Sequence, residues 1–345
     1  MAGVAGIVAA VILAGAAARA EDADQLYAEA KNEKTLVLYG GGPAAPYEHM
    51  ARDFERRYPG ITVSVTGGFS NVLDRKIDAQ LAAKTLDVDM AFFQTAQDFV
   101  RWKKADVLLP FKPEGYDRID PRFRDPDGAF TTASVVLLSY AYNTNLVAPA
   151  DVPASALDFL KPQFSGKLVT AYPADDDATL YVFDTIVKKY GWDYMTKYMA
   201  QKPSFIQGHL EVLRSVAAGT NLVTFDSTSS TTGALKKAGR PIEFAFPSDD
   251  ALPTFFVTVG IFREAPHPNA AKLFLDWYMA KEQQSRLGTY SARTDIDPPE
   301  GLKPLSAQKI EAGYLQFVSD ETRLIELRKR LESYTGPVVN TGGVR

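Results

Sequence analysis

Six consecutive hydroxyl side chains, Ser227 to Thr232, follow an apolar segment, 222–225, that has the pattern of a buried strand. Hydroxyls are neutral hydrogen-bond donors, so they can surround a phosphate, phosphonate or carboxylate without burying a second charge. The alternative is a solvated loop that only caps the next helix. The position after a strand favours ligand binding, and the candidate contacts here are Asp226, Ser227, Thr228 and Ser229.

Two glycine-containing loops also follow predicted strands. Gly40-Gly41-Gly42 separates a strand from a helix start, where backbone N–H groups form an anion site and glycine permits close approach of a ligand. The segment 67–71 follows the next strand in the same way. The alternatives are a tight turn in the first loop and a helix N-cap at Ser70 in the second. The candidate contacts in these loops are Gly41, Gly42, Ser70 and Asn71.

Three acidic residues, Asp175 to Asp177, precede a predicted helix. Acidic residues in a first helical turn are ordinary capping and dipole compensation. Alternatively, one of them receives an ammonium group of a ligand, and the nearby tyrosine stacks on or hydrogen-bonds a bound organic molecule. The candidate contacts in this region are Tyr172, Asp175 and Thr179.

No common catalytic signature is present. The sequence has no G-x-S-x-G, H-E-x-x-H, P-loop or G-x-G-x-x-G motif and no cysteine. His49, His209 and His267 lack metal-ligand spacing, so we expect surface or core roles for them. We therefore expect a protein that is not an enzyme, without catalytic residues, cofactor or metal. Catalysis by residues that meet only in the fold remains an alternative, namely an exported hydrolase or lyase.

Short apolar strands and amphipathic helices alternate along the chain and must position these side chains. Apolar residues that recur every third or fourth position predict helices, and short apolar or alternating runs predict strands. A β-α-β-α-β order predicts a parallel sheet with helices on both faces. Strands are predicted at 36–39, 61–65, 88–93, 167–171, 222–225 and 242–246, and helices at 47–58, 71–83, 95–104, 179–190, 194–199, 210–218, 270–281 and 322–333.

Two longer β-rich segments, 135–143 and 255–261, separate regions that each have their own strand–helix alternation. We interpret them as crossings between two α/β lobes, which is the layout of a hinged ligand clamp. Two adjoining domains of an enzyme would be the alternative. The predicted lobes are 21–136 with 259–308, and 137–258 with 309–345.

Composition limits the class of protein. The chain of 345 residues is long enough for two domains, and 46% hydrophobic with 23% charged residues is typical of a globular protein. A net charge of −4 argues against nucleic-acid binding. The first 20 residues are apolar and small and end in Ala18-Arg19-Ala20, which predicts a secretory signal cleaved after Ala20. A membrane anchor is the alternative to that signal. We expect a periplasmic monomer.

Five short phrases occur in order between Leu36 and about Tyr290: Gly67-Gly68-Phe69-Ser70-Asn71, Asp87-Val88-Asp89, Tyr142-Asn143-Thr144-Asn145, Leu213-Arg214-Ser215-Val216 and His267-Pro268-Asn269-Ala270. Together they resemble the ferric-iron-binding and phosphonate branch of family 1 of the ABC-transporter periplasmic solute-binding proteins. Each phrase is weak alone, but their order and spacing are fairly specific. The resemblance implies a type II periplasmic binding fold that delivers a small solute to an inner-membrane ABC permease.

The iron ligands of that family are replaced at their matching positions. The stretch 40–43 stands where a histidine often follows the first strand, and Gln94 stands where a glutamate often follows the third. The paired tyrosines align with Ser227 and Thr228. Because Fe³⁺ needs anionic oxygens, the resemblance does not carry iron binding to this chain. Gln94 and the adjacent Thr95 join the candidate contacts as neutral groups.

The expected function is capture of a small anionic or zwitterionic organic solute between two lobes, with hinge closure recognised by the permease. One alternative keeps the fold but binds ferric iron, with a synergistic anion and with tyrosines in other positions. The other alternative is the exported hydrolase or lyase named above.

Overall fold

The computed structural model describes residues 23–174 and 177–339 and divides into two compact units. Unit 1 contains the described residues up to Ala133, Val257–Arg286 and Ala292–Ile296. Unit 2 contains Ser134–Phe256, Leu287–Ser291 and the described residues from Asp297 onward. The predicted signal segment lies outside the described residues. Within the described ranges, no helix combines the length and apolar character that crossing a membrane requires.

Two strands carry the chain from one unit into the other. They are β5 (Thr131–Asn143) and β10 (Leu252–Phe262), and the two predicted crossings lie inside them. The predicted fold class, α/β with two strand crossings, is confirmed. The predicted lobe limits stay a prediction; by compactness, residues 297–308 fall in unit 2, whereas the sequence assigns them to the first lobe.

The sheet of unit 1 is parallel at its centre. β1 (Thr35–Gly41) pairs in parallel with β2 (Thr62–Gly68) and with β3 (Met90–Phe93). The final part of β10 pairs antiparallel with β3 and with β4 (Leu108–Leu109). Because β1, β2 and β3 run in one direction, their carboxyl ends lie at one edge of the sheet, where ligands bind in such sheets.

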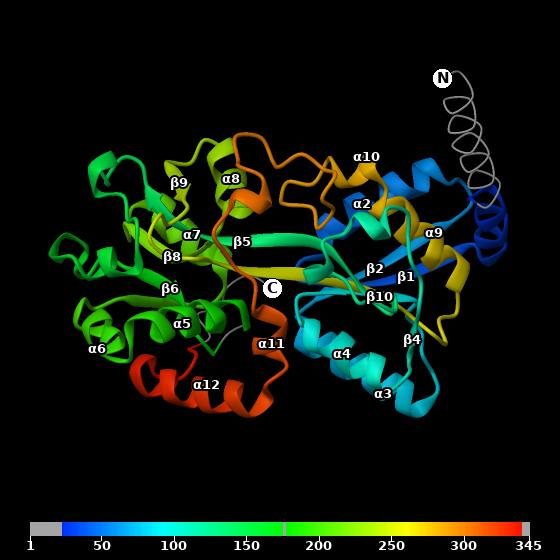
Figure 1. Ribbon diagram of the computed structural model, residues 1–345, viewed down its shortest axis with the longest axis horizontal. Coiled ribbons are helices and arrows are strands. Elements are labelled where there is room, and N and C mark those ends of the chain that lie inside the picture. The colour runs from blue at the N-terminus through cyan, green and yellow to red at the C-terminus, as the bar shows by residue number, and fades with distance from the viewer. Residues whose placement is uncertain (1–22, 175–176, 340–345) are drawn as a thin grey trace, which may run out of the picture. The chain divides into compact units, whose positions relative to one another are not determined.

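Helices cover both faces of the unit 1 sheet (Figure 1). Successive residues of a strand point to opposite faces, and β3 shows this with two aromatic rings. The ring centroids of Phe92 and Phe274 lie 6.2 Å apart, and those of Phe93 and Trp102 also lie 6.2 Å apart. One face therefore carries α2 (Ala44–Arg57) and α9 (Pro268–Met279), and the other carries α3 (Ser70–Ala83) and α4 (Ala96–Lys104).

Unit 2 combines antiparallel and parallel pairing. β5 pairs antiparallel with β8 (Val223–Thr228) and with β9 (Ile242–Ala245). β6 (Val169–Ala171) pairs in parallel with β7 (Ser204–Ile206), and a parallel bridge joins Leu168 to Val223. The carboxyl ends of β6, β7 and β8 therefore share one edge, as in unit 1.

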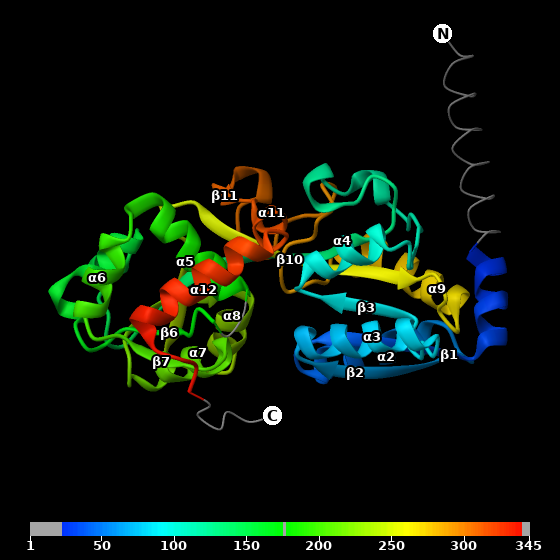
Figure 2. The same cartoon turned by 90° about the horizontal axis from the view of Figure 1, so that it is seen from below.

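Two groups of helices enclose the unit 2 sheet. On one face, Phe225 of β8 packs against Phe183 and Tyr198, which belong to α5 (Asp177–Tyr190) and α6 (Asp193–Ala200). Figure 2 shows this face, with α12 (Glu321–Thr335) near both helices. On the other face, α7 (His209–Ala218) buries an aliphatic cluster against β5 and β6, and α8 (Ser229–Lys237) lies beside α7. Further short elements include α10 (Lys281–Gln284), β11 (Ile310–Glu311) and α11 (Tyr314–Val318).

The hydroxyl run is divided between a strand and a helix. The sequence predicts that the strand ends at Phe225, whereas β8 continues to Thr228 and α8 begins at Ser229. The extension follows from pairing, because Ser139 and Leu138 of β5 lie opposite Ser227 and Thr228. Tertiary pairing thus lengthens a strand whose last residues are polar.

The carboxylate of Asp98 is buried in the first turn of α4, and the residue is only 5% exposed. Its Oδ1 accepts a hydrogen bond from Arg101 Nη2 at 3.1 Å. Burial nevertheless raises the pKa of Asp98 to about 6, and the neighbouring charge of Asp74 adds to the effect. The folded protein therefore binds this proton more tightly than the unfolded chain does.

We expect Asp98→Asn to stabilise the protein at neutral pH. Because the folded pKa lies above the unfolded one, ionised Asp98 costs up to about 3 kcal/mol above pH 6, and this cost disappears as pH falls toward 4. Urea unfolding should show the variant about 1–2 kcal/mol more stable at pH 7.5 and equal to the wild type near pH 4. Asp53→Asn, on the exposed side of α2, is the control and should change little at either pH. A stability difference independent of pH would contradict the assignment.

Candidate functional site

Three predicted contacts of unit 1 meet at the carboxyl edge of its sheet. The hydroxyl of Ser70 donates a hydrogen bond to Gln94 Oε1 at 2.9 Å, and Gln94 Nε2 lies 3.4 Å from the carbonyl oxygen of Gly41. Gly41 ends β1, Ser70 begins α3 and Gln94 follows β3, so three separate strand ends supply the group. We call Gly41, Ser70 and Gln94 the unit 1 cluster.

The hydrogen bond between Ser70 and Gln94 requires a glycine at position 41. A Cβ at this position would lie 2.3 Å from both Gln94 Oε1 and Ser70 Oγ, so a side chain would displace their hydrogen bond. Gly42 has a φ of 99°, a conformation that glycine adopts without strain. The Tyr47 hydroxyl donates to the Gly41 carbonyl at 3.1 Å, and burial raises the pKa of Tyr47 well above its usual range. Tyr47 is therefore a neutral phenol.

The other predicted residues of unit 1 lie around this cluster. Asn71 is exposed in the first turn of α3, and Thr95 precedes α4 without capping it through its side chain. Phe69, just before α3, is 73% exposed, which is unusual for a large aromatic residue. The structure thus brings Gly41, Ser70 and Gln94 into contact and leaves Asn71 exposed beside them.

In unit 2 the hydroxyls at the end of β8 bond mainly to one another. Ser227 Oγ lies 2.7 Å from Thr232 Oγ1 and 3.5 Å from Ser139 Oγ, and Ser227 is fully buried. Thr228 is the N-cap of α8, because its Oγ1 accepts from the backbone N–H of Thr231 at 3.2 Å. Ser229 follows as the first residue of that helix and is nearly buried. The capping role, which was the alternative, occurs at Thr228, and ligand contact by these hydroxyls stays a prediction.

Asp226 is the centre of this region and is 0% exposed. Its Oδ2 accepts hydrogen bonds from the hydroxyl of Thr179 at 3.1 Å and from the hydroxyl of Thr170 at 3.3 Å. It also accepts from the backbone N–H of Ala171 at 3.2 Å. The carboxylate therefore joins β6, α5 and β8, and Thr179 serves Asp226 as a donor.

His209 lies beside the same carboxylate. Its Nδ1 is 3.2 Å from Asp226 Oδ1, and its side chain is 23% exposed. The sequence analysis assigned His209 a surface or core role; its place at the start of the helix before β8 was the available signal.

Two further predictions concern the segment before α5. Tyr172 is nearly buried and packs against Phe205, with ring centroids 5.5 Å apart. Asp177, in the first turn of α5, forms an ion pair with Arg328 of α12. Asp175 lies outside the described residues. Tyr172 therefore lies at the end of β6, next to the residues that bind Asp226.

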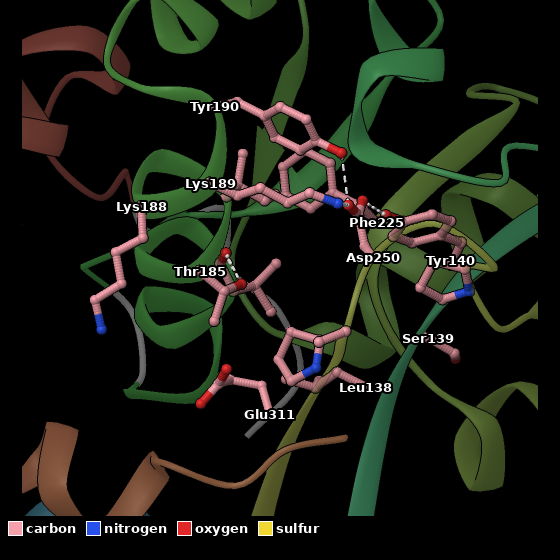
Figure 3. A pocket seen from close by; sticks show the side chains of 15 residues that line it. Leu138, Ser139, Tyr140, Thr185, Lys188, Lys189, Tyr190, Phe225, Asp250 and Glu311 are labelled. Carbon is pink, nitrogen blue, oxygen red and sulfur yellow. Dashed lines mark hydrogen bonds and ion pairs between the residues drawn. The ribbon is translucent and has the colours of Figure 1, made fainter. Parts of the chain in front are cut away.

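A cavity of about 270 Å³ lies elsewhere in unit 2, between α5, β5 and the start of β10 (Figure 3). Asp250 is its central polar group, and it accepts from Tyr140, Tyr190, Lys189 and the backbone of Ala156. Although burial acts to raise it, these bonds hold the pKa of Asp250 below its usual range. The carboxylate is satisfied by the protein itself, and none of the predicted contacts lines the cavity.

The chain is similar in sequence to known proteins. Residues 49–299 match the family model of the bacterial extracellular solute-binding proteins. The Fe(3+)-binding periplasmic protein of Serratia marcescens is 22% identical over 311 residues, covering 83% of this chain and 88% of that protein. A probable ABC transporter periplasmic-binding protein of Sinorhizobium fredii is 24% identical over 257 residues, covering 69% and 67%.

Solved structures share the fold. Iron-bound HitA of Pseudomonas aeruginosa superposes with a TM-score of 0.73 at 19% identity, covering 86% of this chain and 99% of that one. AfuA of Actinobacillus pleuropneumoniae, with exogenous fructose-6-phosphate bound, gives a TM-score of 0.72 at 20% identity, covering 88% and 100%. The type II periplasmic binding fold is thereby confirmed. Because the family model spans most of the chain, this protein belongs to the bacterial extracellular solute-binding protein family.

Proposed function

We propose that this protein is the periplasmic solute-binding component of an ABC importer and that its cargo is a small anionic or zwitterionic organic solute. The main support for this proposal comes from the end of β8. There, Ser227 and Thr228 occupy the positions that the family resemblance assigns to paired tyrosines. Both are neutral, and both belong to a hydroxyl network at the start of α8. Backbone N–H groups at a helix start and neutral hydroxyls favour an oxyanion.

The same residues argue against bare ferric iron as the cargo. Fe³⁺ requires anionic oxygen ligands. Near the end of β8 the carboxylate of Asp226 is fully buried, and its Oδ2 already accepts three hydrogen bonds. Two tyrosines of the described chain are engaged within the protein, because the Tyr47 hydroxyl donates to the Gly41 carbonyl and Tyr198 is buried against Phe225.

Each unit contributes one group of contacts in this proposal. The unit 1 cluster offers the hydroxyl of Ser70 and the amide of Gln94, and unit 2 offers the start of α8 and Tyr172. A solute that binds both groups would favour a closed state for recognition by the permease. Hinge closure, a monomeric state and transport without turnover of the solute are parts of the proposal.

A thermal-shift screen of the mature protein tests the cargo class. The panel contains phosphate monoesters, phosphonates, carboxylates and amino acids, together with ferric citrate. At about 100 times Kd, a matched solute should add about 2.7 kcal/mol to the free energy of unfolding. Recovery of the solute unchanged would separate binding from hydrolysis. Stabilisation by ferric citrate alone, or purified protein coloured by iron, would contradict the proposal.

The double substitution Ser227→Ala and Thr228→Ala should weaken binding of the solute found in that screen. Each lost donor leaves a desolvated anion short of a partner, so calorimetry should show a loss of about 1–3 kcal/mol in all. Loss of the α8 cap should also lower stability by about 1 kcal/mol, which urea unfolding separates from binding. Thr185→Ala is the control, because its hydroxyl bonds within α5 to the Val182 carbonyl. Equal affinity in the double variant and the control would place the site elsewhere.

Gly41→Ala tests the unit 1 cluster. The new Cβ would displace the Ser70–Gln94 hydrogen bond, whose atoms are ends of side chains that can move, so the fold should persist. Loss of this arrangement should weaken solute binding about fivefold, the equivalent of one hydrogen bond. Gly68→Ala is a matched control on the neighbouring strand, because its Cβ would meet Leu73 at an ordinary 3.5 Å. If both variants bind like the wild type, the unit 1 cluster does not contact the solute.

A further inference from the structure

His209 and Asp226 place a partly exposed histidine ring beside a buried carboxylate, at the edge of unit 2 where the predicted contacts gather. His209 is the first residue of α7, which follows β7, and Asp226 lies near the carboxyl end of β8. Their facing atoms, Nδ1 and Oδ1, are 3.2 Å apart. The opposite oxygen of Asp226 is occupied by neutral donors, so those bonds supply no positive charge.

The charged and titratable groups around the pair come from several elements. Tyr198 of α6 lies near Asp226, and burial together with that charge raises the pKa of Tyr198. Glu211 of α7 forms an ion pair with Arg214, and Asp177 of α5 forms one with Arg328. Asp175 and Asp176 precede α5 outside the described residues. Among the described residues, Asp226 is a fully buried acid in direct contact with the ring of His209.

We propose that His209, kept protonated by Asp226, is the cation that the solute site of unit 2 presents to the anionic group of the cargo. The ring is exposed enough for contact, and the neighbouring hydroxyls are neutral. A charge-assisted bond to an oxyanion is stronger than a bond from a neutral donor. The inference rests on the proposed function and adds its specificity: affinity for an anionic solute falls when the ring loses its proton.

A second Asp–His pair provides an internal control. Asp89 is fully buried in unit 1, and its Oδ2 lies 3.0 Å from His267 Nδ1. Asp89 precedes β3, however, so this pair lies at the amino end of that strand, opposite the edge where ligands bind. His267 is also about as exposed as His209, at 25%. Position in the sheet therefore distinguishes two otherwise similar pairs.

The test uses sulfate, whose charge is constant between pH 5 and 9, on the whole mature protein. The chain has three histidines, so NMR resolves each imidazole signal, and His→Gln variants assign them. Sodium sulfate is compared with sodium chloride at matched ionic strength. We expect sulfate to shift the His209 signal and move its titration midpoint to higher pH, while the His267 signal does not respond.

Variants separate charge from structure. His209→Gln should weaken sulfate binding about tenfold at pH 6, the effect of one charge-assisted hydrogen bond. His209→Lys should keep sulfate binding at pH 8, where the wild type loses it. Asp226→Asn should lower the titration midpoint of His209, and circular dichroism shows whether this variant is folded. If Asp226→Asn is not folded, the result for His209→Lys decides the test.

Three results would overturn the inference. These are a His209 signal that responds to sulfate no more than to chloride, equal responses of His209 and His267, and unchanged sulfate affinity in His209→Gln. The proposed function fails separately, if the screen finds iron or no organic anion. An organic anion that binds without affecting His209 would refute this inference alone.

Discussion

A carboxylate buried without access to water must be satisfied by the protein, and Asp226 imposes that requirement on unit 2. Its donors come from β6, through Thr170 and Ala171, and from α5, through Thr179. His209 brings the start of α7 to the same group. Because an unsatisfied buried charge costs several kcal/mol, these four elements must keep their relative positions, and their strand and helix ends converge.

Unit 1 also has a buried carboxylate that joins several elements, but it lies at the amino edge of its sheet. Asp89 accepts from the backbone N–H of Val37 at 2.6 Å and from that of His267 at 2.7 Å, which joins β1, β3 and the start of α9. Burial raises the pKa of Asp89. Because this anchor lies at the amino end of β3, the carboxyl edge remains available for the glycine loop and for the amide of Gln94.

The hydroxyls and amides among the proposed contacts have a physical consequence for selectivity. Hydroxyls and amides can donate to an oxyanion, but they cannot neutralise a trivalent cation. At the end of β8 several hydroxyls already bond to one another, as Ser227 does to Thr232. A solute that replaces such bonds gains only the difference in free energy between the hydrogen bonds it forms and those it breaks. A nearby cation would therefore add much of the binding energy.

Periodicity and resemblance determined the α/β class, the two crossings and most elements, because apolar spacing reports directly which side of a strand or helix is buried. They also placed Gly41, Ser70 and Gln94 at strand ends, where the structure brings them together. The extension of β8 to Thr228 depended on its pairing with β5, which local propensity does not encode. The contact of His209 with Asp226 joins residues 17 positions apart on different elements, so only the tertiary structure could show that a histidine without metal spacing serves a buried carboxylate.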